Sequence, residues 1–112
     1  MGLAQRTEAV EWHARVWFRT SRDAEWRMGI SRSVSTTRAV IQSDDLPLVF
    51  DAIVVVIALS ATGCLVGRGH VVRAQPSAPD SPANFAILVN QYALEHREPI
   101  LSGFSSSVLD RH

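Results

Sequence analysis

Residues 46–67, with the sequence LPLVFDAIVVVIALSATGCLVG, carry most of the information about the expected fold. This run contains a single charge, Asp51, and the part from Ala52 to Gly67 contains none. A helix that crosses the hydrocarbon core of a membrane needs about 20 mostly apolar residues. Pro47 would lie in the first turn of such a helix, where a missing N–H costs little. The run therefore predicts a single transmembrane helix and a membrane location.

The same run allows a second interpretation, a buried strand at 53–59, because that part is rich in Val and Ile. Continuous apolar strands of about four to eight residues are typical of sheets that are covered on both faces. This interpretation gives a small α/β fold, such as a fragment of an enzyme subunit. The length of the whole run favours the membrane helix.

The polar N-terminal region, residues 1–45, is rich in Arg and in acidic residues. Between Val10 and Phe18 apolar and polar residues alternate, which is typical of a strand. However, several of these apolar residues also share one side of a helix, and a lone strand has no evident partner, so a helix is favoured. Residues 29–45 are rich in Ser and Thr and predict a linker or a weak strand.

An amphipathic helix is predicted at residues 82–96. Ser81 is a favourable N-cap residue, and Pro82 then occupies the first helical position. Mostly apolar side chains recur at helical spacing along one face. They are Phe85, Leu88, Val89, Tyr92, Ala93 and His96.

The predicted fold class is therefore mostly α, with one transmembrane helix, one short amphipathic helix and weakly structured flanks. The chain divides into a polar Arg-rich region at 1–45, an apolar membrane segment at 46–67, a linker at 68–81, and the amphipathic helix with a tail at 82–112. The linker is predicted because Pro76 and Pro79 within it, and Pro82 directly after it, interrupt regular structure.

The residues Ser60-Ala61-Thr62-Gly63-Cys64 follow an apolar stretch. This arrangement resembles the lipobox of bacterial lipoproteins, and the resemblance covers Leu46 to Cys64. It implies that Cys64 is lipidated and becomes the first residue of an exported, lipid-anchored protein. The alternative is that Cys64 behaves as a small apolar residue within the membrane helix.

Three small residues in the apolar run, Ser60, Gly63 and Gly67, predict a helix–helix contact. Two Gly residues four positions apart let helix backbones approach closely. The expected partners are membrane lipid and, through the apolar helix, a second copy of the chain or another membrane protein.

The charge balance and the single cysteine exclude several classes of function. Eleven Arg residues, with no Lys, balance eleven acidic residues. Binding to nucleic acid depends on positive charge, so no nucleic-acid partner is expected. One cysteine excludes an internal disulfide and a Cys-based zinc site. The histidines, His13, His70, His96 and His112, lack metal-ligand spacing, so no metal is expected.

No nucleophile motif, phosphate loop or carboxylate pair occurs, so we expect no catalytic residues and no cofactor. The predicted function is that of a small accessory or interaction protein in a membrane, without catalysis. A lipid-anchored exported protein processed at Cys64 and a soluble α/β enzyme fragment are the alternatives.

Overall fold

Alternation between more and less buried side chains is seen along several of the longer strands of the computed structural model, which describes residues 9–60 and 63–95. All elements in these residues are strands. They are β1 (Val10–Glu11), β2 (Arg15–Thr20), β3 (Arg27–Val34), β4 (Arg38–Gln42), β5 (Ala52–Ala58), β6 (Cys64–Gln75) and β7 (Asn84–Glu95). The protein is therefore all-β, and the prediction of a mostly α fold is wrong.

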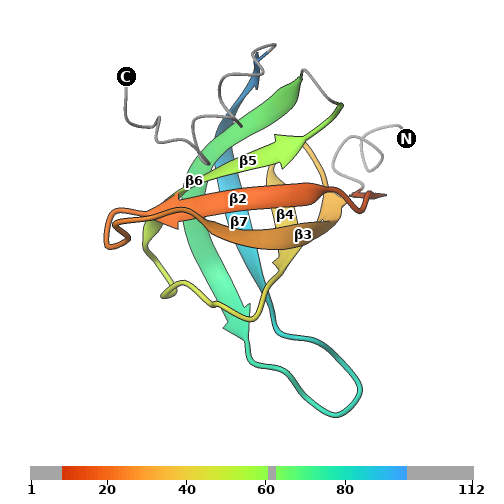
Figure 1. Ribbon diagram of the computed structural model, residues 1–112, viewed down its shortest axis with the longest axis vertical. Helices are drawn as coiled ribbons and strands as arrows, with labels where there is room; N and C mark the ends of the chain where they lie inside the picture. Colours follow the sequence, from red (N-terminus) through yellow and green to blue (C-terminus); the bar gives the residue numbers. More distant parts are fainter. Residues whose placement is uncertain (1–8, 61–62, 96–112) are drawn as a thin grey trace, which may run out of the picture.

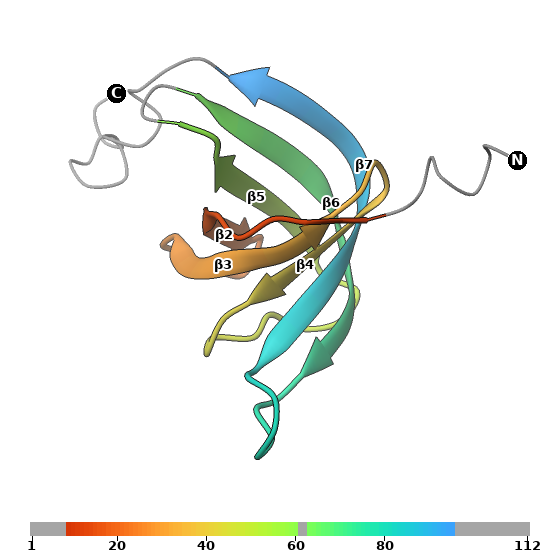
Figure 2. The same cartoon turned by 90° about the vertical axis from the view of Figure 1, so that its right-hand side faces the viewer.

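The strands pair in the order β1-β3-β2-β5-β6-β7-β4, and every pairing is antiparallel. A further pairing of β3 with β4 closes six of the strands into a barrel (Figure 1). The short β1 pairs with the last two residues of β3. In the side view, β6 and β7 curve along one wall of this barrel (Figure 2).

The apolar run at 46–67 does not form one element. It contributes a loop, then β5, then a turn, and finally the first residues of β6. Within β5, Ile53, Val55 and Ile57 point into the barrel and are at most 2% exposed. β-branched residues suit such a strand, and β2 and β6 supply backbone partners on both of its sides. The alternative prediction of a buried strand at 53–59 matches this element, although the sheet is antiparallel and not part of an α/β fold.

No helix that is long and apolar enough to cross a membrane occurs in residues 9–60 and 63–95. The predictions of a transmembrane helix, of a membrane location, of a function as a small single-pass membrane protein, and of lipid or protein partners reached through that helix are therefore wrong. Their common error was to treat continuous hydrophobicity as evidence for a single helix.

The predicted amphipathic helix at 82–96 is also wrong, because residues 84–95 form β7. Phe85, Ile87 and Val89 alternate into the core, whereas Leu88 points outward and is 46% exposed. The spacing that suggested a helical face therefore mixed inward and outward residues of a strand. His96 lies outside the described residues.

In the N-terminal region the favoured helix is wrong, because β1 and β2 form there. The alternation of apolar and polar residues between Val10 and Phe18 was the pattern that indicated the correct structure. The predicted linkers are shorter than expected. Residues 29–45 contain most of β3 and all of β4, and β6 continues to Gln75, well into the linker that was predicted at 68–81.

The core lies inside the barrel and draws on five strands. Phe18 of β2 and Phe85 of β7 meet there edge to face, with ring centroids 4.8 Å apart. The remaining buried members of this core are Val16, Ala39, Ile41, Ile53, Val55, Ile57, Val71, Ile87 and Val89. These side chains fill most of the interior, and the buried polar side chains among the described residues are Thr20, Ser31 and Ser43.

Candidate binding groove

An open groove of about 800 Å³ runs over the outer faces of β2, β5, β6 and β7. Valine side chains contribute apolar surface to it, and Arg, His and Trp side chains contribute its polar edges. Ligand pockets are commonly about 300–1,000 Å³ and combine apolar walls with a few polar groups. We refer to this feature as the outer groove.

The sheet register brings two arginines to opposite sides of one valine. Arg19 of β2 is paired with Val54 of β5, and Val54 is paired with Arg68 of β6. Adjacent strands lie about 4.8 Å apart, so the two arginine backbones are separated by roughly 10 Å. Since directly paired side chains project from the same face, both guanidinium groups belong to the outer face above Val54.

The outward-facing residue pairs on either side of Val54 and Arg68 also line the outer groove. On one side, Ala52 is paired with His70, and on the other side Val56 is paired with Val66. Val56 is only 3% exposed even though it alternates with the inward residues of β5. The outer groove therefore has a well-packed apolar floor below basic side chains.

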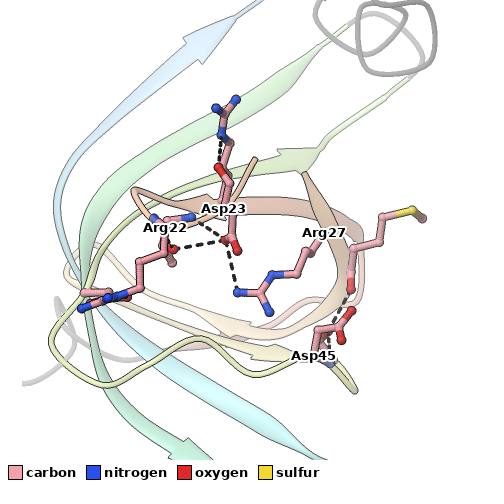
Figure 3. Close-up of polar contacts among 9 residues, drawn as sticks. Arg22, Asp23, Arg27 and Asp45 are labelled. Carbon is pink, nitrogen blue, oxygen red and sulfur yellow. Dashed lines mark hydrogen bonds and ion pairs between the residues drawn. The ribbon is translucent and has the colours of Figure 1, made fainter. Parts of the chain in front are cut away.

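The hairpin between β2 and β3 forms one rim of the outer groove, and Asp23 holds it together (Figure 3). The Asp23 Oδ2 atom accepts hydrogen bonds from the Thr20 backbone N–H at 2.9 Å and the Thr20 hydroxyl at 3.1 Å. It also accepts one from Arg27 Nη2 at 3.2 Å, and this guanidinium lies 5.2 Å above the centre of the Phe18 ring. Asp23 thus links the rim to the end of the core.

These contacts change the acidity of Asp23. Partial burial raises its pKa, but the Thr20 backbone N–H, the Arg27 charge and the side-chain hydrogen bonds from Thr20 and Arg27 together outweigh burial, so the pKa lies below its ordinary value. The carboxylate is therefore ionised at neutral pH and is suited to organising the hairpin.

Arg19 is positioned by the same hairpin. Its Nε donates to the Asp23 backbone carbonyl at 3.3 Å, and its guanidinium carbon lies 5.9 Å from the centre of the Trp26 ring. An Arg over a Trp face is attracted by the ring quadrupole. Arg19 is thus held at the rim with Trp26 beside it, which reduces the entropy that it would lose on binding an anion.

A close approach between β6 and β7 shapes the other side of the outer groove. At Gly69, a Cβ atom would lie 1.9 Å from the backbone oxygen of Leu88, so no larger residue fits without movement of the backbone. The register shifts here, with Arg68 opposite Gln91 and Gly69 opposite Val89. Asn90 is the extra residue of this bulge and lines the outer groove. Such bulges commonly redirect side chains next to functional sites.

The residues singled out from the sequence lie mostly elsewhere. Ser60 and Gly63 belong to the turn between β5 and β6, where the Ser60 N–H donates to the Gly63 carbonyl at 3.2 Å. Gly67 lies in β6, where an added Cβ would be 3.1 Å from the Tyr92 ring. These three residues are therefore not on one helix face, which the predicted helix–helix contact required.

Cys64 is the first residue of β6 and is 1% exposed. Burial raises the pKa of its thiol, and the nearby Glu95 carboxylate adds to this effect. A raised pKa disfavours the reactive thiolate. Lipidation of Cys64 is not tested by this geometry and stays a prediction.

The histidines are dispersed among the described residues. His70 lines the outer groove, and His13 Nε2 lies 3.4 Å from the Glu11 carboxylate. Within residues 9–60 and 63–95, no three His, Cys, Asp or Glu side chains are grouped so that they could hold a metal ion.

The sequence interpretation did not identify Arg19, Trp26, Arg68 or His70 as residues of a binding site. One signal was present, because Arg68 and His70 alternate with Gly67, Gly69 and Val71. That alternation is typical of a strand with one polar face. The link to Arg19 required knowledge of the strand order.

Comparison with known proteins supports the fold. No protein-family model and no curated protein matches the sequence. Among solved structures, the Bacillus subtilis inhibitor of motility (MotI/DgrA) is similar, with a TM-score of 0.64 and 12% sequence identity. The match covers 96% of this chain and 52% of that one, so this chain spans about half the length of the Bacillus protein. At this identity the likeness shows a shared fold.

Proposed function

We propose that this chain is a non-catalytic binding module whose outer groove takes an apolar segment carrying negative charge. The observation that carries the proposal is the placement of Arg19 and Arg68 on either side of Val54, above an apolar floor. Burying apolar surface on such a floor would contribute about 25 cal/mol per Å². The two guanidinium groups would provide charge-assisted hydrogen bonds to carboxylates.

The charges around the outer groove favour an anionic ligand. Arg19 and Arg68 lie among its lining residues, and Glu95 is the one acid there. Glu95 is paired with Cys64, the first residue of β6, whereas Arg68 lies further along that strand. A ligand carboxylate placed between Arg19 and Arg68 would therefore be separated from Glu95 along the sheet.

We also propose that the outer groove binds its ligand without catalysing a reaction. The Thr20 hydroxyl at the edge of the outer groove donates to the Asp23 carboxylate, and Thr20 is 4% exposed. This hydroxyl is thus engaged in holding the hairpin and is poorly placed for attack on a ligand. The similar Bacillus protein is an inhibitor of motility, and we extend to this chain only the general idea of action through binding.

The test is a nuclear magnetic resonance titration of the ¹⁵N-labelled full chain with the capped peptide Glu-Glu-Leu-Phe-Leu. We expect chemical-shift changes at Val54, Val66 and Arg68. The neutral peptide Gln-Gln-Leu-Phe-Leu and the polar peptide Glu-Glu-Ser-Ser-Ser should both bind more weakly, because each lacks one of the two required features.

The variant Arg68→Gln should weaken binding of the acidic apolar peptide by roughly tenfold, the loss typical of one charge-assisted contact. Arg32→Gln is the matched control, because Arg32 is exposed on β3 and bonds to Gln42. Equal binding of all three peptides, or shift changes confined to other faces of the barrel, would refute the proposal.

A further inference from the structure

Three apolar residues project from the loop that joins β4 to β5. Leu48 is 58% exposed, Val49 38% and Phe50 81%. We call these three residues the apolar tip. A contiguous exposed apolar group of this kind marks a contact site more often than a single exposed side chain does.

The apolar tip is held in place by its backbone. Phe50 has a φ of 80°, a left-handed conformation that is unusual for a bulky residue. Its N–H donates to the Val71 carbonyl at 2.7 Å, and the Val71 N–H donates to the Asp51 carbonyl at 3.0 Å. Arg22 Nε bonds to Asp51 Oδ2 at 2.7 Å, which ties the loop to the β2–β3 hairpin. Strained residues persist where their surroundings determine them strongly, and they cluster at functional sites.

The charge next to the apolar tip is negative. Residues 43–51 contain Asp44, Asp45 and Asp51 and no basic residue. Asp51 is paired with Arg22, whereas the exposed Asp44 and Asp45 carboxylates form no ion pair within residues 9–60 and 63–95. The tip is thus an apolar projection accompanied by two carboxylates, which would be repelled by an anionic lipid surface.

The apolar tip and the outer groove have complementary properties. One is a projection of apolar side chains with negative charge beside it, and the other is an apolar depression between Arg19 and Arg68. We infer that the outer groove of one copy of this chain takes the apolar tip of a second copy. This inference rests on the proposed function of the outer groove and names its partner.

The positions of the two surfaces favour a closed dimer. His70 lines the outer groove, and the next residue, Val71, accepts the hydrogen bond from Phe50. The apolar tip therefore lies beside one end of the outer groove. When complementary surfaces are neighbours in this way, a two-fold axis between the copies can satisfy both contacts at once, and an isologous dimer of this kind is closed and does not grow into fibres.

Sedimentation velocity of the full chain over a range of concentrations tests this inference. The unmodified chain should dimerise, and Phe50→Ser and Arg68→Glu should each raise the dissociation constant by roughly tenfold or more, as expected at the centre of an interface. The controls are Met28→Ser, which removes another apolar side chain that is 57% exposed, and Arg32→Glu. Both controls should dimerise like the unmodified chain.

Mixing the two variants separates a specific contact from a folding defect. Phe50→Ser retains an intact outer groove, and Arg68→Glu retains an intact apolar tip, so a mixed dimer regains one of its two contacts. The mixture should therefore associate more strongly than either variant alone. A mixture that associates no better than the separate variants would overturn the inference.

The peptide titration distinguishes the two proposals. If the chain is monomeric at every concentration and still binds the acidic apolar peptide, the dimer is refuted and the proposed function stands. If the chain dimerises without sensitivity to Phe50 or Arg68 and the peptide does not bind, both proposals fail.

Discussion

The β5 part of the barrel interior and the apolar tip come from the same apolar run of sequence but have opposite environments. Ile53, Val55 and Ile57 are at most 2% exposed, whereas Phe50, a few residues earlier, is 81% exposed. The difference lies in backbone pairing. β5 has strand partners on both sides, and the apolar tip is attached to β6 through Val71. Hydrophobicity alone therefore does not determine which residues are buried.

The comparison also separates stability from binding. A fully buried Phe or Ile side chain contributes about 1.5–3 kcal/mol relative to an exposed one. Apolar residues inside the barrel thus stabilise the fold. The exposed residues of the apolar tip would gain the free energy of burial only on binding a partner. Substitutions in the two regions should have clearly different effects.

The largest loss of stability is expected from Phe18→Ala in the interior. This change removes the ring that packs on Phe85 and should lower the free energy of unfolding by about 3–5 kcal/mol. Urea unfolding followed by circular dichroism measures the loss. The matched substitution Phe50→Ala should change stability by about 0.5 kcal/mol at most, as is usual at exposed sites. Similar losses for both variants would contradict the distinction between the two regions.

The next largest loss of stability is expected from a substitution at Gly69, where β6 lies unusually close to β7. Gly69→Ala would place a methyl group against the Leu88 backbone oxygen and should cost about 3 kcal/mol, the upper end for overpacking. Gly67→Ala is the control. There the added methyl group would be 3.1 Å from the Tyr92 ring and 3.2 Å from Val55 Cγ2, and these are side-chain atoms rather than backbone, so the cost should be nearer about 1 kcal/mol, the lower end for overpacking. The reverse order in thermal unfolding would show that the β6–β7 approach leaves room for a methyl group at Gly69.

A smaller effect is expected from Asp23→Asn, which loosens the rim of the outer groove. At pH 7 the change should cost about 1.5 kcal/mol, because hydrogen bonds to a charged group are lost. The folded-state pKa of Asp23 is lowered, so its contribution is complete above the ordinary Asp value of about 3.9 and is lost as pH falls through the lowered folded value.

The difference between Asp23→Asn and the unmodified chain should therefore shrink as the pH is lowered from about 4. Urea unfolding at a series of pH values measures it. A difference that stays constant down to the acid limit would show that the Asp23 charge does not stabilise the hairpin.

The smallest change in stability is expected at Phe50 of the apolar tip, where a Gly variant should be more stable than an Ala variant. At Phe50, with φ of 80°, Gly should be more stable than Ala by about 1 kcal/mol, because Ala retains the Cβ clash of a left-handed residue. In ordinary strand positions the order is reversed. Comparing the unfolding free energies of Phe50→Gly and Phe50→Ala tests this point, and a more stable Ala variant would exclude backbone strain at the apolar tip.

Local patterns in the sequence indicated parts of the fold correctly. The alternation between Val10 and Phe18 indicated a strand, and the Val- and Ile-rich stretch at 53–59 indicated another. The first was set aside because a lone strand had no evident partner, and the second because the whole apolar run is longer than a typical strand. The Phe85–Tyr92 region misled in a different way, since its apolar residues satisfy helical spacing and strand alternation together. Short apolar stretches cannot be assigned by periodicity alone.

Three properties follow from the amino-acid order without any coordinates: the zero net charge, the absence of an internal disulfide, and the period-two alternation that favours strands. The three-dimensional arrangement was needed to show that these strands close into a barrel, that Arg19 and Arg68 lie on either side of Val54, and that Phe50 remains exposed. The physical reason is that a strand forms its hydrogen bonds with distant parts of the chain. Its partners, and therefore the neighbours of every outward side chain, are not contained in any local pattern.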